Sequence, residues 1–245
     1  MTLKAVLFDF NGVIMNDEPI HDRLIGELLL GESLRPDPKE LAELCLGRSD
    51  RACLNDLFER RSRVLSDRDL DRLLAIKAAA YQAELSQMER LPIYAGLEDL
   101  IYRCRVADLK LAVVSGARRA EVELVLERTG LRSYFSVLVT SDDVPTSKPD
   151  PGGYLLAIEQ LRQFCPELQA ENCLAIEDSF AGIEAAKRAR ISVVGVASTY
   201  PFHMIQRQAN WAIDYINDLE LERVQRVFAG LDGAEPPEPI SPLPA

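Results

Sequence analysis

The sequence predicts an α/β fold, a doubly wound parallel sheet into which an all-helical segment is inserted. Two observations support this prediction. Short apolar segments rich in strand-forming residues alternate with amphipathic segments, and this order is typical of parallel strands joined by right-handed helical crossovers. The alternation is interrupted between residues 16 and 91, where apolar residues recur only at helical spacing.

The first expected strand begins almost at the start of the chain. Val6–Phe8 belong to an apolar run that indicates a strand buried on both faces, and Asp9 ends this run. Asn11 and Gly12 follow, and glycine allows a sharp turn because it adopts positive φ without steric cost. By itself the pattern Asp-x-Asn-Gly is most often only a turn, so a functional role for it depends on the other strand ends.

The helical segment is expected to form a domain of its own. Apolar residues recur in it every three or four positions, as in amphipathic helices. Pro36 and the Gly47-Arg48-Ser49 segment separate consecutive helices. We therefore assign residues 16–91 to a helical cap, and residues 1–15 and 92–231 to an α/β core.

The alternation of strands and helices returns after Gly96. The expected elements are helices over 97–107, 119–128, 153–164, 181–189 and 219–228, and strands over 109–115, 137–141, 173–178, 192–197 and 212–216. Residues 232–245 contain five prolines in fourteen positions and little to bury, so we expect a disordered tail.

Composition argues against some classes of partner. The net charge of −11 and the pI near 4.8 disfavour nucleic acid, because such partners require basic groups that neutralise phosphates. No apolar run approaches membrane-spanning length, and no signal-type segment precedes the first strand. We expect a soluble, cytoplasmic protein that does not act at a membrane and is a monomer or a weak homo-oligomer.

The cysteines are odd in number, scattered and without metal-like spacing. We expect all of them to be reduced packing residues. They are Cys45, Cys53, Cys104, Cys165 and Cys173.

Chemically useful side chains follow several of the expected strands. Ligands of open parallel sheets bind at the carboxyl ends of the strands, at the topological switch point. The residues expected there are Asp9, Ser115, Lys148 and the Glu177-Asp178 pair. Each alone has a structural explanation, as a turn, a helix cap or a loop charge. Together, acidic groups suited to a hard cation and a lysine with helix amides suited to an anion predict a site for phosphate and a divalent cation.

Four motifs, in this order, resemble those of the haloacid dehalogenase-like (HAD) hydrolase superfamily, and most of all its β-phosphoglucomutase-like branch with a helical cap. The resemblance covers essentially the whole chain up to about residue 230. It rests on Asp9-Phe10-Asn11-Gly12-Val13-Ile14, Val113-Val114-Ser115-Gly116, Lys148-Pro149-Asp150-Pro151 with Tyr154, and Ile176-Glu177-Asp178-Ser179 followed by Ala181-Gly182-Ile183. It implies a Rossmann-like core and a phosphatase that acts on a small phosphorylated metabolite such as a sugar phosphate.

The resemblance further implies an aspartyl-phosphate mechanism with Mg²⁺ as the cofactor. Asp9 would attack phosphorus in line, and the metal would offset the repulsion between Asp9 and the phosphate. The implied metal site comprises Asp9, the backbone carbonyl of Asn11, Glu177 and Asp178. The implied phosphoryl-binding groups are Ser115, Gly116, Ala117 and Lys148.

One position departs from the pattern of the family. Phosphatases and mutases of the family carry a second aspartate, an acid–base catalyst, where this chain has Asn11. An amide neither gives nor takes a proton near neutral pH, and general acid–base catalysis contributes about 10²–10⁴ in rate. The phosphoenzyme should still form, with slow turnover or with a proton carrier from elsewhere. His21, at the entrance to the cap, is a candidate carrier, and a hinge hydrogen bond is the alternative role for it.

The cap is expected to select the substrate. The Gly47-Arg48-Ser49 loop resembles the cap loop that reaches over the site in relatives, so we expect this loop and His21 to contact the substrate. A phosphomutase of the same chemistry is an alternative, and so is a weakly active or non-catalytic binder of phosphorylated ligands, because of Asn11. A dehalogenase is disfavoured because the Glu177-Asp178 pair favours a metal.

Overall fold

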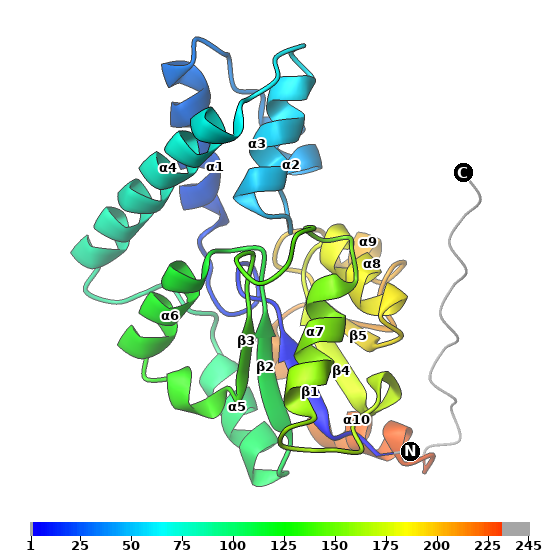
Figure 1. Cartoon of the computed structure of the whole chain (residues 1–245). Coiled ribbons are helices and arrows are strands. Elements are labelled where there is room, and N and C mark those ends of the chain that lie inside the picture. The colour runs from blue at the N-terminus through cyan, green and yellow to red at the C-terminus, as the bar shows by residue number, and fades with distance from the viewer. Residues whose placement is uncertain (1, 232–245) are drawn as a thin grey trace.

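The computed structural model describes residues 2–231 of the 245-residue chain, so the tail expected over 232–245 lies outside the described residues. The strands are β1 (Ala5–Phe8), β2 (Lys110–Val114), β3 (Val137–Val139), β4 (Cys173–Glu177), β5 (Ser192–Val196) and β6 (Trp211–Ile213). They form one parallel sheet in the order β3-β2-β1-β4-β5-β6 (Figure 1). The predicted α/β fold is therefore confirmed.

The first strand occupies the middle of the sheet. Leu7 of β1 is paired with Ala112 of β2 on one side and with Ala175 of β4 on the other. The chain thus builds outward from β1 to β3 and then returns to lay β4 on the opposite side of β1. Such a reversal of strand order opens a crevice at the carboxyl ends of β1 and β4, where ligands of doubly wound sheets bind.

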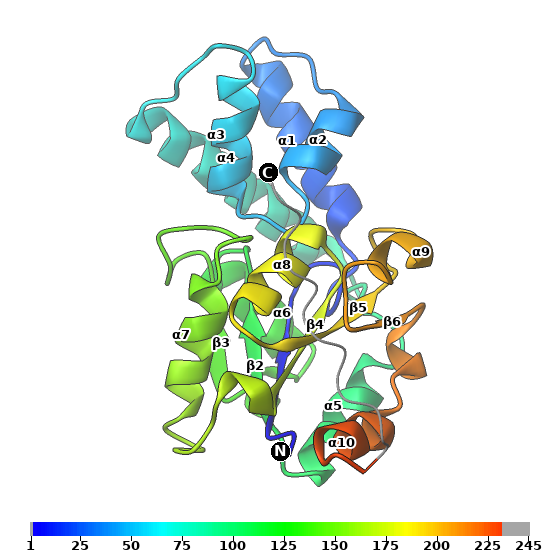
Figure 2. The same cartoon turned by 90° about the vertical axis from the view of Figure 1, so that its right-hand side faces the viewer.

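Helices cover both faces of the sheet (Figures 1 and 2). They are α5 (Leu97–Val106), α6 (Arg119–Arg128), α7 (Gly152–Leu161), α8 (Phe180–Arg188), α9 (Phe202–Ile205) and α10 (Leu221–Phe228). Val6 and Phe8 of β1 belong to the hydrophobic cluster shared with α5, α6 and α10, and Ala5 and Leu7 to the cluster shared with α7, α8 and α9. This alternation explains why β1 is apolar throughout, since strands buried on both faces need no polar positions.

A group of four consecutive helices, which we call the cap, stands over the carboxyl edge of the sheet (Figure 1). They are α1 (Glu18–Gly31), α2 (Pro38–Leu44), α3 (Asp50–Glu59) and α4 (Asp67–Gln87). They enclose a separate hydrophobic cluster that includes Leu29, Leu54 and Leu73. The two chain segments that join cap to core lie side by side, because Asn16 N donates to Pro92 O at 2.7 Å.

The expectation that all five cysteines are reduced is wrong for two of them. Cys45 and Cys53 form a disulfide, while Cys104, Cys165 and Cys173 are free. Cys45 follows α2 and Cys53 lies in α3, and the connecting loop folds back so that their Cα atoms are 4.6 Å apart, within bridging range. Sequence spacing cannot reveal such a reversal of the chain.

Some boundaries differ from the expected ones, and one helix was not predicted. The third strand ends at Val139 instead of 141, and the sixth spans only Trp211–Ile213. The helix α9 follows Pro201 and has four residues, too few to show a periodic pattern. None of the helices in the described part of the chain combines the length and the apolar character needed to cross a membrane.

Candidate active site

The ends of β1 and β4 and the loop after β3 bring three charged side chains together. The Lys148 ammonium lies between two carboxylates, 2.9 Å from Asp9 Oδ1 and 2.7 Å from Glu177 Oε1. All three residues are buried. Burial lowers the pKa of Lys148, but the charges of Asp9 and Glu177 outweigh burial and raise that pKa above its ordinary value. Lys148 therefore stays charged inside the protein.

Asp178 completes a cluster of buried carboxylates. Ligand oxygens of Asp9, Glu177 and Asp178 all lie within 4.8 Å of one another. Burial and the charge of Asp9 raise the pKa of Glu177 to about 8, and burial with the charge of Glu18 raises that of Asp178. Burial is the larger cause of both shifts, and the neighbouring carboxylates add to it. The oxygen donors of the cluster are those that a hard divalent cation prefers.

The turn after β1 approaches this cluster closely. Gly12 has φ +75°, and a Cβ at this position would lie 1.9 Å from Asp178 Oδ2. Glycine is therefore needed here both for its backbone conformation and for the space that it leaves. Ser198 donates its hydroxyl hydrogen to the Gly12 carbonyl oxygen at 2.5 Å, which fixes the turn from the side of β5.

Hydroxyl groups from neighbouring elements hold the carboxylates in place. Tyr154 of α7 donates to Glu177 Oε1, and Thr199, which follows β5, donates to Asp178 Oδ2. Neither Thr199 nor Ser198 was predicted as a site residue. Tyr154 was named as part of the third motif, but no role was assigned to it. Ser198 and Thr199 follow a strand end as Asp9 does, so the strand-end position was a usable signal for both.

Ser115, Gly116 and Ala117 form a turn between β2 and α6, in which Ser115 and Ala117 are buried. Ser115 Oγ accepts a hydrogen bond from Ala117 N at 2.9 Å. A Cβ at Gly116 would lie 2.9 Å from the carbonyl carbon of Arg48, so the cap backbone closes over this turn. Main-chain amides that precede a helix are suited to an anion, and this turn lies at the strand end next to Asp9.

Asn11 is hydrogen-bonded to the cap side of the crevice. Its Nδ2 donates to both carboxylate oxygens of Asp17, at 3.0 and 3.1 Å. Asp17 is fully buried and also accepts from the hydroxyl of Tyr81 in α4. Burial raises the pKa of Asp17, but hydrogen bonds from His21, Asn11 and Tyr81 outweigh burial and lower it. Asp17 is therefore an ionised carboxylate, and it was not predicted as a site residue.

His21 has partners at both ring nitrogens. Its Nδ1 lies 2.6 Å from the Lys77 ammonium, which can only donate, so Nδ1 accepts and Nε2 carries the hydrogen. Nε2 then donates to Asp17 Oδ2 at 3.2 Å. The 3.1 Å contact between Nε2 and Asn11 Nδ2 brings two donors together and is not a hydrogen bond. The side chain still lines a cavity of about 50 Å³ together with Asp9 and Asn11.

The Gly47-Arg48-Ser49 loop lies against the core. A Cβ at Gly47 would be 2.1 Å from Ser179 Oγ, and Ser49 N donates to Ser147 Oγ at 2.7 Å. The Arg48 guanidinium binds within the helical cap instead of to the core, because its Nη1 donates to the Asp56 carboxylate of α3 at 2.6 Å. This part of Arg48 therefore holds the cap together.

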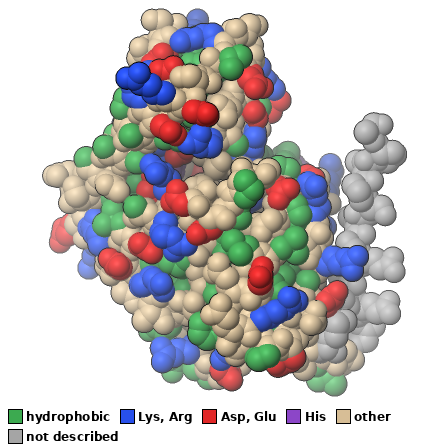
Figure 3. Space-filling model, in the orientation of Figure 1, with side chains coloured by type: hydrophobic (Ala, Val, Ile, Leu, Met, Phe, Trp, Pro, Cys, Tyr) green, Lys and Arg blue, Asp and Glu red, His purple; other side chains and the backbone are tan. Residues whose placement is uncertain are grey.

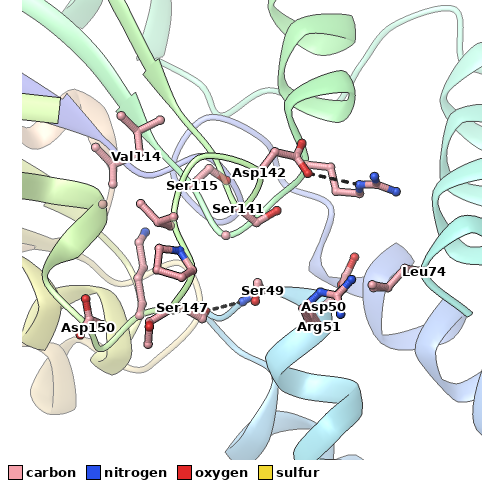
Figure 4. Close-up of a pocket in the computed structure, with 18 of the residues that line it drawn as sticks. Ser49, Asp50, Arg51, Leu74, Val114, Ser115, Ser141, Asp142, Ser147 and Asp150 are labelled. Carbon is pink, nitrogen blue, oxygen red and sulfur yellow. Dashed lines mark hydrogen bonds and ion pairs between the residues drawn. The ribbon is translucent and has the colours of Figure 1, made fainter. Parts of the chain in front are cut away.

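A cavity of about 410 Å³ opens beside Ser115 and Lys148, between the cap and the core (Figure 4). Two guanidinium groups in its wall are already paired, Arg118 with Asp142 at 3.7 Å and Arg51 with Asp71. The volume is in the range of about 300–1,000 Å³ that is typical of small-molecule sites. On the outer face seen in Figure 3, acidic and basic side chains are interspersed, without the broad basic surface that nucleic acid requires.

Comparison with known proteins gives consistent matches. Residues 3–190 match a family described as haloacid dehalogenase-like hydrolase. A phosphorylated carbohydrates phosphatase of Thermotoga maritima is 30% identical over 191 residues, which are 77% of this chain and 82% of that protein. The β-phosphoglucomutase of Bacillus subtilis is 26% identical, and the match covers 90% of this chain and 93% of the length of that protein. The structure of a β-phosphoglucomutase from Clostridium difficile matches with a TM-score of 0.83 and 23% identity, over 93% of this chain and 98% of that one, a likeness of fold alone.

Proposed function

The chain belongs to the haloacid dehalogenase-like hydrolase family, and from this premise we propose that it is a Mg²⁺-dependent phosphatase of a small phosphorylated metabolite, similar to the β-phosphoglucomutase-like branch of that family. The observation that carries the proposal is the Lys148 ammonium held between Asp9 and Glu177 at the switch point of the sheet. A buried carboxylate beside a fixed cation suits attack on a phosphate group, because the cation attracts the phosphate that the carboxylate repels.

Asp9 is the proposed nucleophile. One of its carboxylate oxygens attacks the phosphorus of a phosphate ester, the bond to the leaving oxygen breaks, and an aspartyl phosphate forms. Water then attacks this phosphorus and loses a proton, which balances the proton that the leaving oxygen takes up, the bond to Asp9 breaks, and inorganic phosphate is released. Lys148, Ser115 and the amides of Gly116 and Ala117 bind the phosphoryl oxygens and stabilise their charge during both steps.

Asp9, Asp178 and the main-chain carbonyl of Asn11 are the groups that would hold Mg²⁺. The buried carboxylate oxygens of Asp9, Glu177 and Asp178 lie within 4.8 Å of one another, and such a cluster of oxygen donors fits a divalent cation. Glu177 Oε1 already accepts from Lys148 and Tyr154, so we assign Glu177 to orienting these groups and to the outer surroundings of the metal. When bound, the cation would reduce the repulsion between Asp9 and the phosphate.

The cavity of about 410 Å³ beside Ser115 would receive the rest of the substrate. Its wall offers hydroxyl groups, and its guanidinium groups are paired with carboxylates. These features favour a neutral, hydroxylated moiety such as a sugar. The name of the Thermotoga maritima relative, a phosphorylated carbohydrates phosphatase, supports this substrate class. We assign residues 16–91 the role of a cap that closes over the substrate.

A phosphomutase is the second candidate, and the Bacillus subtilis relative favours it. A mutase would return the phosphoryl group from Asp9 to a sugar hydroxyl instead of to water. Asn11 favours a third possibility, a weakly active binder of phosphorylated ligands, because it removes the usual acid–base group. The products distinguish the candidates: a phosphatase releases inorganic phosphate, a mutase yields an isomeric sugar phosphate, and a binder yields neither.

The proposal is tested by measuring phosphate release from a panel of aryl and sugar phosphates, with Mg²⁺ and with a chelator. We expect release that requires both Mg²⁺ and Asp9, so Asp9→Asn should be inactive. Asp108→Asn is a matched control, because Asp108 is an exposed residue before β2 whose side chain contacts Lys110. Equal release by wild type and Asp9→Asn would refute the nucleophile, and an isomeric sugar phosphate without free phosphate would favour the mutase.

A further inference from the structure

Asp17 is a buried carboxylate that does not do what its position in the chain suggests. It is the N-cap residue of α1, where an aspartate ordinarily accepts a hydrogen bond from an amide of the first helical turn. The Asp17 side chain makes no such bond. It accepts instead from Asn11 in the core and from Tyr81 in α4. A strong local preference has therefore been overridden by contacts across the junction of core and cap.

The contact with Asp17 fixes the orientation of the Asn11 amide. An amide nitrogen only donates hydrogen bonds, and Nδ2 faces Asp17, at 3.0 and 3.1 Å from its two oxygens. The amide oxygen Oδ1 must then point away from Asp17. Within residues 2–231 no donor contacts Oδ1, and Asn11 lines the cavity of about 50 Å³ that also contains Asp9. Oδ1 is free to accept from a group bound there.

We infer that Asp17 is a positioning residue for the leaving-group side of the reaction, and that Asn11 and Asp17 form an exchangeable amide–carboxylate pair. Asp17 holds Asn11 with its Oδ1 toward the reacting oxygen, so the site offers an acceptor and no proton. This inference rests on the proposed phosphatase function and narrows its substrates. It favours phosphate esters with weakly basic leaving oxygens, such as aryl phosphates or a phosphate on an anomeric carbon, over those on primary alcohols.

The pairing also explains why an aspartate does not suit position 11 in this chain. Asn11→Asp would bring a second carboxylate to the contact now 3.0–3.1 Å long. Two carboxylates so close cannot both ionise and neither offers a donor, so they would share a proton. Exchanging the two residues, Asn11→Asp with Asp17→Asn, restores a donor opposite an acceptor in nearly the same shape. The amide oxygen at position 17 can still accept from Tyr81. Position 11 then carries a carboxyl group that can give a proton to the leaving oxygen.

The first test is a thermal unfolding cycle in a chelator, with the wild type, Asn11→Asp, Asp17→Asn and the exchanged double variant. We expect Asn11→Asp to unfold at least roughly 2–4 °C below the wild type, the shift that about 1 kcal/mol gives in a protein of this size, and the double variant to recover most of that loss. Glu27→Gln, which removes one charge from an exposed position on α1, is the control and should change little. If the shifts of the two single variants simply add in the double variant, the residues are not a pair and the inference is wrong.

The second test compares turnover of an aryl and an alkyl phosphate by the same proteins. An acid at position 11 helps only the leaving group that needs a proton, so the exchanged variant should turn over the alkyl phosphate about 10²-fold faster relative to the aryl phosphate. If Asn11 and Asp17 had a merely structural role, this ratio would stay unchanged. An unchanged ratio would therefore contradict the inference. An equal increase of this ratio in the Asn11→Asp single variant would also overturn the inference. If no protein shows Asp9-dependent phosphate release, the proposed function fails, while the thermal cycle still decides the pairing.

Discussion

Replacement of Lys148 by methionine tests the charge arrangement at the strand ends. Methionine retains most of the buried aliphatic stem but removes the ammonium that lies 2.9 Å from Asp9 and 2.7 Å from Glu177. Removing one partner of a buried ion pair costs about 3–5 kcal/mol, because it leaves buried charge without compensation. A protein of this size loses roughly 2–4 °C in Tm per kcal/mol. We therefore expect Tm in a chelator to fall by roughly 6–20 °C.

The assay is thermal unfolding of Lys148→Met and wild type between about pH 5 and pH 8. The loss should be larger at the upper end, because the carboxylates can take up protons at the lower end. Mg²⁺ should stabilise the variant more than the wild type, since a cation replaces the missing charge. Lys4→Met is the matched control, because Lys4 forms an exposed pair with Glu167, and such pairs contribute at most about 1 kcal/mol. A Tm within about 2 °C of wild type for Lys148→Met would refute the reasoning.

Three further outcomes are expected. In a chelator, stability should fall as pH rises from about 5 to 8, because Glu177, with its pKa raised to about 8, binds a proton in the folded state that the unfolded chain has already lost. Mg²⁺ should flatten this dependence of stability on pH. A stability that rises with pH would contradict the prediction. Asp178→Ala should weaken Mg²⁺ binding in calorimetric titration, and unchanged affinity would remove Asp178 from the metal site. Cys45→Ser should lower the free energy of unfolding in urea by about 2–3 kcal/mol, and a reductant should destabilise the wild type but not the variant. If the reductant affects both proteins equally, the Cys45–Cys53 bridge does not form.

The centre of the fold could be predicted because local sequence carries its signal. The apolar run before Asp9 specifies a strand buried on both faces, and parallel topology then brings strand ends to one edge of the sheet. This reasoning predicts that Asp9 and Glu177 lie together, and in the structure both contact Lys148. The same rule extended to the end of β5 would have included Thr199.

The contacts that depend on how the cap meets the core could not be predicted in this way. Asp17 and Tyr81 are 64 positions apart, and their hydrogen bond exists only because α1 and α4 pack side by side. An aspartate before a helix indicates an N-cap by every local rule, so its turn toward Asn11 leaves no trace in the sequence pattern. The Cys45–Cys53 bridge was missed for a similar reason, since it depends on the fold of the loop between α2 and α3.

The most direct test of the central claim, that Asp9 is the nucleophile of a Mg²⁺-dependent phosphatase, is to trap the phosphoenzyme. The protein is mixed with an aryl phosphate and Mg²⁺, quenched in acid during turnover, digested and analysed by mass spectrometry. We predict one phosphoryl group on the peptide that contains Asp9, and none in Asp9→Asn or when a chelator replaces Mg²⁺. Release of inorganic phosphate without a phosphoryl group on that peptide, or with the group on another residue, would contradict the account.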